Sequence, residues 1–172
     1  MSGSYSGRGR DRSIASGMVM ILVLSVTATI VLLVAGLIYY SGSSARTASD
    51  YTAVAAPANL ALTGEVNGYT HHQRDDLAAA RSDLRREART EASFDTKLAA
   101  LTFPGAASSA ADVLIQADQK RVKLIGLQAQ STSLRELRSF NGADQSATAA
   151  VEVQVGRIRQ ALGLPPASGG LF

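Results

Sequence analysis

Residues 18–40 read MVMILVLSVTATIVLLVAGLIYY, and no charged residue occurs anywhere from Ile14 to Ala45. A helix over residues 18–40 would be roughly 35 Å long, which is enough to cross a bilayer core of about 30 Å. Such a helix also bonds its backbone polar groups internally, as the hydrocarbon requires. The stretch Met18–Tyr40 therefore predicts a transmembrane helix whose partner is the lipid bilayer.

The charges on the two sides of this stretch indicate its orientation. The Gly- and Ser-rich tail 1–17 carries Arg8, Arg10 and Arg12, whereas Arg46 is the only basic residue close after the stretch. Positive charge favours the cytoplasmic side of a membrane segment. We therefore expect a disordered cytoplasmic tail over 1–17 and an extracytoplasmic C-terminal part.

A cleavable signal peptide is the alternative interpretation of the same stretch. Ser43-Ser44-Ala45 would supply the small residues of a cleavage site. The apolar region of a signal peptide is about 7–15 residues long, which is shorter than the stretch 18–40. The sequence therefore favours an uncleaved signal anchor.

The remainder of the chain is nearly neutral and contains no cysteine. After the three Arg and one Asp of the tail are taken from the chain's 17 basic and 14 acidic residues, 14 basic and 13 acidic residues remain. This balance gives no electrostatic reason to expect a nucleic acid as partner. Without cysteine the chain has no disulfide, no thiolate metal site and no lipid-modified N-terminal cysteine.

Beyond the apolar stretch, apolar residues recur at three- and four-residue steps, which predicts helices. Residues 41–49 are expected to form a linker or a frayed continuation of the membrane helix, and a first helix begins near Asp50. Pro57 lies within this helix and lacks an amide hydrogen, so we expect a kink or a restart there. Asn67-Gly68 then breaks the helical pattern.

A second helix is expected from Thr70 to about Thr102. Thr70 and Gln73 match a capping box, in which each side chain bonds an exposed backbone amide. The apolar stripe of this helix has charged residues on both sides, which either pair with neighbouring helices or, as we favour, form two solvated flanks. The basic flank contains Arg81, Arg85 and Arg89, and the acidic flank contains Asp83, Glu87 and Glu91.

Two further helices follow Phe103-Pro104-Gly105, where proline and glycine disfavour continuation. The third is expected from Ser109 to about Ser139, with Leu114, Asp118, Val122 and Ile125 along one face and a solvated basic cluster at 120–123. The fourth begins after an Asn141-Gly142 turn with Asp144 as its cap. Its apolar stripe is the clearest of the chain: Ala147, Val151, Val155, Ile158 and Leu162.

The fourth helix has a strong stop signal. Gly163 can adopt the left-handed cap, Leu164 can pack back onto the last turn, and Pro165-Pro166 prevents continuation. Four helices with short connections favour an antiparallel up-down bundle over 50–166, followed by a flexible tail over 167–172. The predicted fold is therefore all-α, with a single N-terminal transmembrane helix followed by a four-helix bundle.

Three short motifs in the bundle resemble those of Ala-rich extracytoplasmic helical proteins of actinobacteria, many of them lipoproteins. They are Ala56-Pro57-Ala58-Asn59, the segment Asp112–Asp118 and the ending Leu162-Gly163-Leu164-Pro165-Pro166. The resemblance covers about Tyr51–Pro166 and implies a helical domain held at the membrane. This chain differs from those proteins because a membrane helix replaces the lipid-modified cysteine.

The best candidate for a metal site is the group His71, His72, Asp75 and Asp76. On a helix starting at Thr70, each His lies four residues before an Asp on the same face. The carboxylate-bridged di-iron bundles need Glu-x-x-His motifs on two helices, and none occurs in this chain. We therefore favour no metal site, and we find no motif for catalysis or for a cofactor.

We interpret the chain as a single-pass membrane protein that presents its bundle outside the cell. Its expected role is structural or in interactions, as an accessory envelope component and not an enzyme, with a protein partner or a second copy of the chain. A ligand- or metal-sensing bundle is the main alternative. A pilin-like subunit is a weaker one, because the apolar helix after Gly17 lacks the acidic residue that pilin helices carry near their start.

Overall fold

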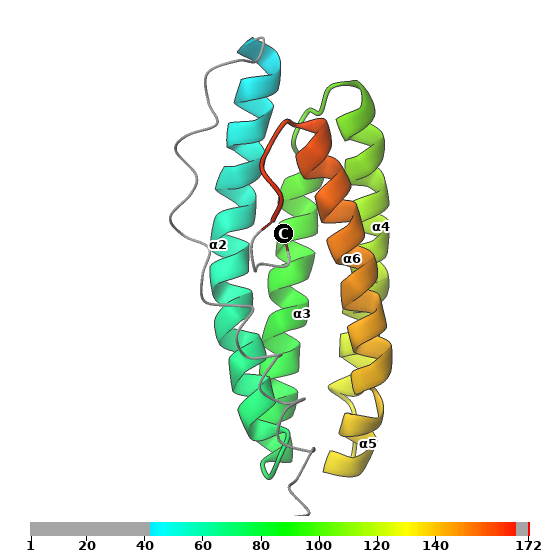
Figure 1. The fold of residues 1–172 in the computed structure, drawn as a ribbon. Coiled ribbons are helices and arrows are strands. Elements are labelled where there is room, and N and C mark those ends of the chain that lie inside the picture. Colours follow the sequence, from blue (N-terminus) through cyan, green and yellow to red (C-terminus); the bar gives the residue numbers. More distant parts are fainter. Residues whose placement is uncertain (1–41, 168–171) are drawn as a thin grey trace, which may run out of the picture.

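The computed structural model describes residues 42–167 and residue 172 of the chain (Figure 1). These residues form five helices and no strand, which confirms the all-α prediction. The predicted cytoplasmic tail 1–17 and membrane helix 18–40 lie outside the described residues. No helix within the described part is long and apolar enough to cross a membrane. The helices are α2 Gly42–His72, α3 Leu77–Ala99, α4 Gly105–Gln128, α5 Leu134–Ser139 and α6 Asn141–Ala161.

Four of the five helices are long and lie side by side (Figure 1). α2 packs against α3, α3 against α4, and α4 against α6. The segments 73–76 and 100–104 join the first three long helices, so each runs antiparallel to the one before it. The short helix α5 lies at one end of the molecule, next to the start of α6.

α2 extends further at both ends than the sequence predicts. Residues 42–49 are helical and do not form a linker. No new helix begins at Pro57, which lies inside α2. The expected break at Asn67-Gly68 is wrong, since α2 continues to His72. A Cβ on Gly68 would lie only 3.0–3.1 Å from the Asp83 carboxylate, so this glycine permits a close approach of α3 and does not mark a turn.

The expected start of the second helix at Thr70 is also wrong. Thr70 lies within α2, and the Gln73 side chain accepts a hydrogen bond from the Asn141 amide at 2.9 Å, so it does not cap a helix. α3 begins at Leu77, where the Asp76 carboxylate accepts from the backbone amide of Ala79 at 2.9 Å. An aspartate at this position is among the best N-caps, which explains why the helix begins there.

The single third helix expected from Ser109 to Ser139 is in fact two helices. α4 begins earlier, at Gly105, whose φ is +45°, and ends at Gln128. After residues 129–133, α5 starts with Ser133 as its cap, whose hydroxyl accepts from the Glu136 amide at 3.2 Å. Glu136 in turn accepts from the Thr132 amide at 2.6 Å, so a capping signature was present in the sequence at these positions.

α6 begins at Asn141, so Asn141-Gly142 is its first turn and not a connection. Asp144 is not the cap and lies in the first turn of the helix. The predicted ending is confirmed: Gly163 has a φ of +67°, its amide donates to the Gln160 carbonyl, and the Leu164 amide donates to the Arg159 carbonyl. This is the Schellman arrangement, which satisfies the last carbonyls of the helix.

The prediction that 167–172 forms a loose tail is wrong for Phe172. This residue is 2% exposed, and its ring stacks on Phe94 with centroids 3.7 Å apart. The Asn59 side chain bonds both backbone groups of Phe172, accepting from its amide at 2.9 Å and donating to its carbonyl at 2.5 Å. Residues 168–171 lie outside the described part of the chain.

The buried apolar residues form two hydrophobic clusters along the bundle axis. The larger cluster lies toward the start of α2 and contains Tyr51, Ala55, Leu62, Phe94, Leu98, Ala107, Ala111, Leu114, Val151, Val155, Ile158, Leu162 and Phe172. The smaller cluster lies toward α5 and contains Tyr69, Ala80, Leu84, Ile125, Ala129 and Leu137. Four of the five residues in the predicted stripe of the last helix belong to the larger cluster.

Candidate functional site

A layer of charged side chains separates the two hydrophobic clusters. Along α3, Glu87 and Glu91 lie between Leu84 of the smaller cluster and Phe94 of the larger one. Along α4, Asp118 and Arg121 lie between Leu114 of the larger cluster and Ile125 of the smaller one. We call this group the charged layer. Its charged members are Glu87, Glu91 and Asp95 on α3, Asp118 and Arg121 on α4, and Asp144 on α6, and the Thr148 hydroxyl on α6 bonds Arg121.

Arg121 is the cation at the centre of the charged layer. Its guanidinium is buried and pairs with Glu87 at 2.5 Å and with Glu91. Its Nε donates to the Thr148 hydroxyl at 2.8 Å and lies 3.3 Å from the Asp144 carboxylate. The expected solvated face at 120–123 is therefore wrong for Arg121. The residue lies three positions after Asp118 and four before Ile125, on the face that α4 turns to the core.

The acidic flank predicted on the second helix is buried and not solvated. Asp83, Glu87 and Glu91 are between 0% and 3% exposed. The flank lies against the core because α2 packs on one side of it and α4 on the other. On the basic flank, Arg85 and Arg89 are exposed, as expected. Arg81 is half-buried and donates to the Ala129 carbonyl at 2.9 Å.

Asp95 and Asp118 face each other across the seam between α3 and α4. They are 6% and 0% exposed, and their four oxygens receive no hydrogen bond from any other described group. Burial, followed by the Asp118 charge, raises the pKa of Asp95 to about 8. Burial also raises the pKa of Asp118 to about 7, although its hydrogen bond with Asp95 acts in the opposite direction. A hydrogen bond between two carboxyl groups requires a proton on one of them.

The pKa values of Glu87 and Asp144 in the charged layer are raised as well. Burial raises the pKa of Glu87, and the Arg121 charge only partly offsets this effect. Burial likewise raises the pKa of Asp144, and the Arg121 charge again acts in the opposite direction. The layer thus contains one guanidinium and five carboxyl groups, so it favours bound protons over full ionisation.

The structure does not bring the four metal candidates together. His72 lies 2.7 Å from the Asp83 carboxylate, which also pairs with Arg86. Asp76 caps α3, and the ring of His71 contacts that of His72 edge-on. The predicted pairing of His and Asp four residues apart is wrong because α2 ends at His72. In the part of the chain that the structure describes, no group of three or more His, Cys, Asp or Glu residues could hold a metal ion.

The contact between Gly68 and Asp83 can be tested by substitution. In Gly68→Ala, the new Cβ would lie 3.0 Å from the Asp83 carboxylate and disturb its contact with His72. Crowding costs about 1–3 kcal/mol, and the gain in helix propensity is about 1 kcal/mol. We therefore expect a net loss of about 1 kcal/mol in the free energy of unfolding, measured by urea denaturation.

Gly64 in the same helix provides the matched control. A Cβ on Gly64 meets nothing within 4 Å, so Gly64→Ala should instead stabilise the protein by about 1 kcal/mol through propensity alone. Equal stabilisation by the two substitutions would show that Gly68 is not needed for the close approach of α3.

A hydrogen-bond network closes the α5 end of the bundle. The buried Gln128 amide donates to the Tyr69 hydroxyl at 2.6 Å and to the Leu137 carbonyl at 3.0 Å. The Tyr69 hydroxyl in turn donates to the side-chain Oδ1 of Asn141 at 2.7 Å. Burial, with the nearby Asp144 charge, raises the pKa of Tyr69. The phenol therefore remains a neutral hydrogen-bonding group that joins α2 to α4 and α6.

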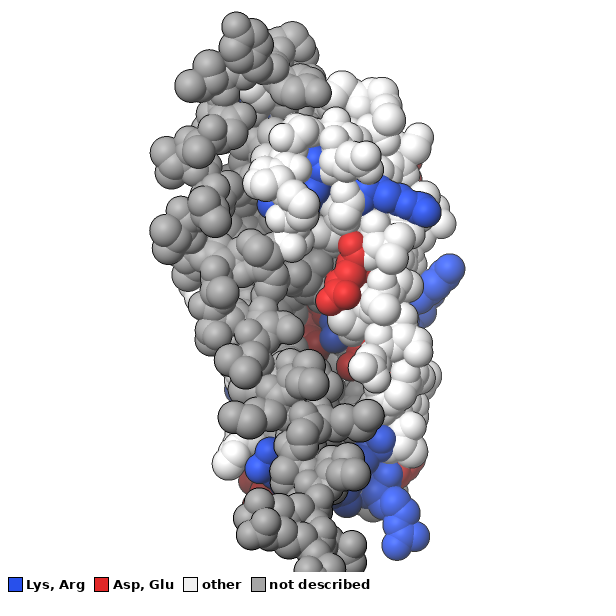
Figure 2. Space-filling model, in the orientation of Figure 1, with Lys and Arg blue, Asp and Glu red and all other residues white. Residues whose placement is uncertain are grey.

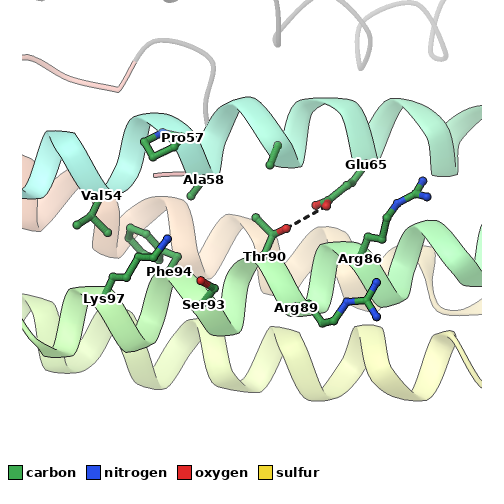
Figure 3. Close-up of a pocket in the computed structure, with 11 residues that line it drawn as sticks. Val54, Pro57, Ala58, Glu65, Arg86, Arg89, Thr90, Ser93, Phe94 and Lys97 are labelled. Carbon is green, nitrogen blue, oxygen red and sulfur yellow. Dashed lines mark hydrogen bonds between the residues drawn. The ribbon is translucent and has the colours of Figure 1, made fainter.

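A groove of about 360 Å³ runs between α2 and α3 (Figure 3). Its α2 wall is mainly apolar, and its α3 wall carries Arg86, Arg89 and Lys97. Glu65 reaches across from α2 and accepts a hydrogen bond from the Thr90 hydroxyl at 2.9 Å. On the face shown in Figure 2, charged side chains of both signs lie scattered among uncharged ones and form no single patch.

No family model, no curated protein and no solved structure matches the chain. The resemblance to Ala-rich actinobacterial proteins therefore stays a prediction. The assignment of a function depends on the geometry of the bundle and on the sequence before it.

Proposed function

We propose that the protein is a single-pass membrane protein whose antiparallel helical bundle serves outside the cell as a non-catalytic interaction module. In this proposal, Met18–Tyr40 is the anchor, residues 1–17 lie in the cytoplasm, and the bundle is an accessory part of a larger envelope assembly. A second protein chain, or a second copy of this one, is the partner.

The observation that carries this proposal is the early start of α2. The helix begins at Gly42, two residues after the apolar stretch ends at Tyr40. A bundle attached so closely to an anchor has little freedom to turn relative to the membrane. A fixed orientation suits a module that presents one surface to a neighbour in the same membrane.

The outer surface of α4 and α6 supports the choice of a protein partner. A shallow groove of about 440 Å³ between these helices is lined mostly by small or uncharged side chains. Val113 in the lining and Val153, which directly precedes the lining residue Gln154 on α6, are 42% and 54% exposed. Small residues let a partner helix approach closely, and exposed valines add apolar area at the contact.

The topology can be tested with single cysteines, because the chain contains none of its own. In intact cells, a membrane-impermeant maleimide should label Ala167→Cys, at an exposed position after α6, and not Ser2→Cys. Both variants should react after lysis, which controls for the reactivity of each thiol. Labelling of Ser2→Cys alone in intact cells would reverse the proposed orientation.

The interaction role needs a separate experiment in the native membrane. A photo-crosslinking residue at Val153 should give a reproducible adduct with one protein, whereas the same residue at Leu60, which is exposed on α2, should not. If neither position gives an adduct, the interaction role is rejected even where the topology holds.

A ligand-sensing bundle is the second candidate, and the groove between α2 and α3 favours it. Its apolar wall and its three basic residues match an amphipathic anion. Stabilisation by a long-chain fatty acid in a thermal-shift assay, lost in Arg89→Ala, would support this candidate. An unchanged melting temperature would remove it.

A further inference from the structure

The seam between α3 and α4 contains a pair of acids that no other group in the described residues 42–167 and 172 neutralises. Arg121 is occupied by Glu87, Glu91 and Asp144, and the carboxyl groups of Asp95 and Asp118 bond only each other. Both side chains are almost fully buried. Two buried carboxylates in contact cannot both ionise without strong repulsion. We propose that Asp95 and Asp118 form a proton-binding site that holds α3 against α4 when protonated and loosens this seam when it loses its protons.

The surrounding charges strengthen the dependence on protons. On α3 the Glu87 charge adds to burial in raising the pKa of Asp118. Arg121 on α4 pairs with Glu91 on α3 and Asp144 on α6, and Arg159 on α6 acts on Tyr51 by its charge. On α2, Glu65 raises the pKa of Glu87 by its charge. Burial raises the pKa of Tyr51, also on α2, to about 12, so this phenol stays neutral. Acids outnumber bases in this set, and they oppose ionisation of the pair.

The direction of the pH effect follows from proton linkage. An unfolded aspartate has a pKa near 3.9, whereas burial raises both folded-state values to near neutral. The contribution of this pair to the free energy of unfolding is therefore fully present below about pH 4, falls as pH rises, and is lost once pH passes the folded-state pKa values. For each additional proton held by the folded state, the folded-to-unfolded ratio falls about tenfold per pH unit in this window.

Carboxyl NMR of the full-length ¹³C-labelled protein in detergent tests the inference directly. The Asp95 and Asp118 resonances should titrate near neutral pH, and midpoints below pH 5 for both would overturn the proposal. This measurement needs no variant, so it decides the question even where a substitution at the pair prevents folding.

Urea unfolding between pH 5 and pH 8.5 tests the consequence for stability. In Asp118→Asn, the amide can donate to Asp95 without a proton, so the decline of stability with pH should be shallower by about one bound proton. Asp112→Asn, at an exposed position on the same helix, is the matched control and should keep the wild-type decline. A decline in Asp118→Asn equal to that of the control would overturn the proposal. The inference does not depend on the membrane location.

Discussion

Replacing Arg121 by methionine is expected to lower the free energy of unfolding by about 3–5 kcal/mol, because it leaves buried carboxylates without their cation. The Arg121 side chain is 4% exposed and contacts acids on two other helices. Methionine fills a similar volume, so most of the loss comes from Glu87 and Glu91, which are 3% and 0% exposed. Urea denaturation monitored by circular dichroism at pH 7.5 measures the loss.

Two comparisons separate the ion pairs from other effects of this substitution. Lys120→Met removes a charge from the exposed neighbouring position and should change the stability by less than about 0.5 kcal/mol. Combining Arg121→Met with Glu87→Gln and Glu91→Gln should restore part of the loss, because the two most buried partners of Arg121 then carry no charge. Equal losses from Lys120→Met and Arg121→Met would contradict the central role of this guanidinium.

Replacing Phe172 by alanine is expected to lower the free energy of unfolding by about 3 kcal/mol, as for other buried phenylalanines. The ring is 2% exposed and stacks on Phe94 in the larger hydrophobic cluster. Its removal takes aromatic contact area from the core and leaves a cavity beside Phe94. Thermal or urea unfolding of the full-length variant measures the change.

The backbone contacts of Phe172 can be tested separately. Asn59→Ala removes both hydrogen bonds to Phe172 and should cost about 1–3 kcal/mol while leaving the ring in place. Leu127→Ala is the control for loss of an apolar side chain at an exposed position, since Leu127 is 57% exposed and should tolerate truncation. A Phe172→Ala variant as stable as Leu127→Ala would show that the ring does not contribute to the core.

The helical class and the last helix could be predicted because both depend on local patterns. The stripe from Val151 to Leu162 repeats at the helical period, and Gly163 with Leu164 forms the cap that the sequence indicates. The boundary between α2 and α3 could not be predicted from the sequence. Gly68 is a glycine because the Asp83 side chain of another helix lies so close to it, and this contact is not visible in the sequence. The sequence alone does not distinguish a glycine that marks a turn from one that permits close packing of two helices.

The charged layer was hidden for a similar reason. Arg121 and Glu87 are 34 residues apart in the chain, and only the packing of α4 on α3 makes them partners. One signal was nevertheless present: Asp118 lies on the same helical face as Leu114 and Ile125, a position that is buried if the helix forms. An acid within a predicted apolar stripe indicates either that the helix prediction is wrong or that the acid is buried. Here the acid is buried and belongs to the charged layer.

The charged layer also affects how the chain partitions at a lipid bilayer. α4 has 24 residues, enough to cross the hydrocarbon, and it carries several Leu and Ile side chains. An Asp or Arg at the centre of a membrane helix opposes insertion by about 2.5–3.5 kcal/mol on the biological scale. Asp118 and Arg121 together therefore add a barrier of about 5–7 kcal/mol against lateral entry of α4 into lipid. Asp118 and Arg121, which are buried in the folded bundle, thus also oppose entry of this helix into the membrane while the chain is still unfolded.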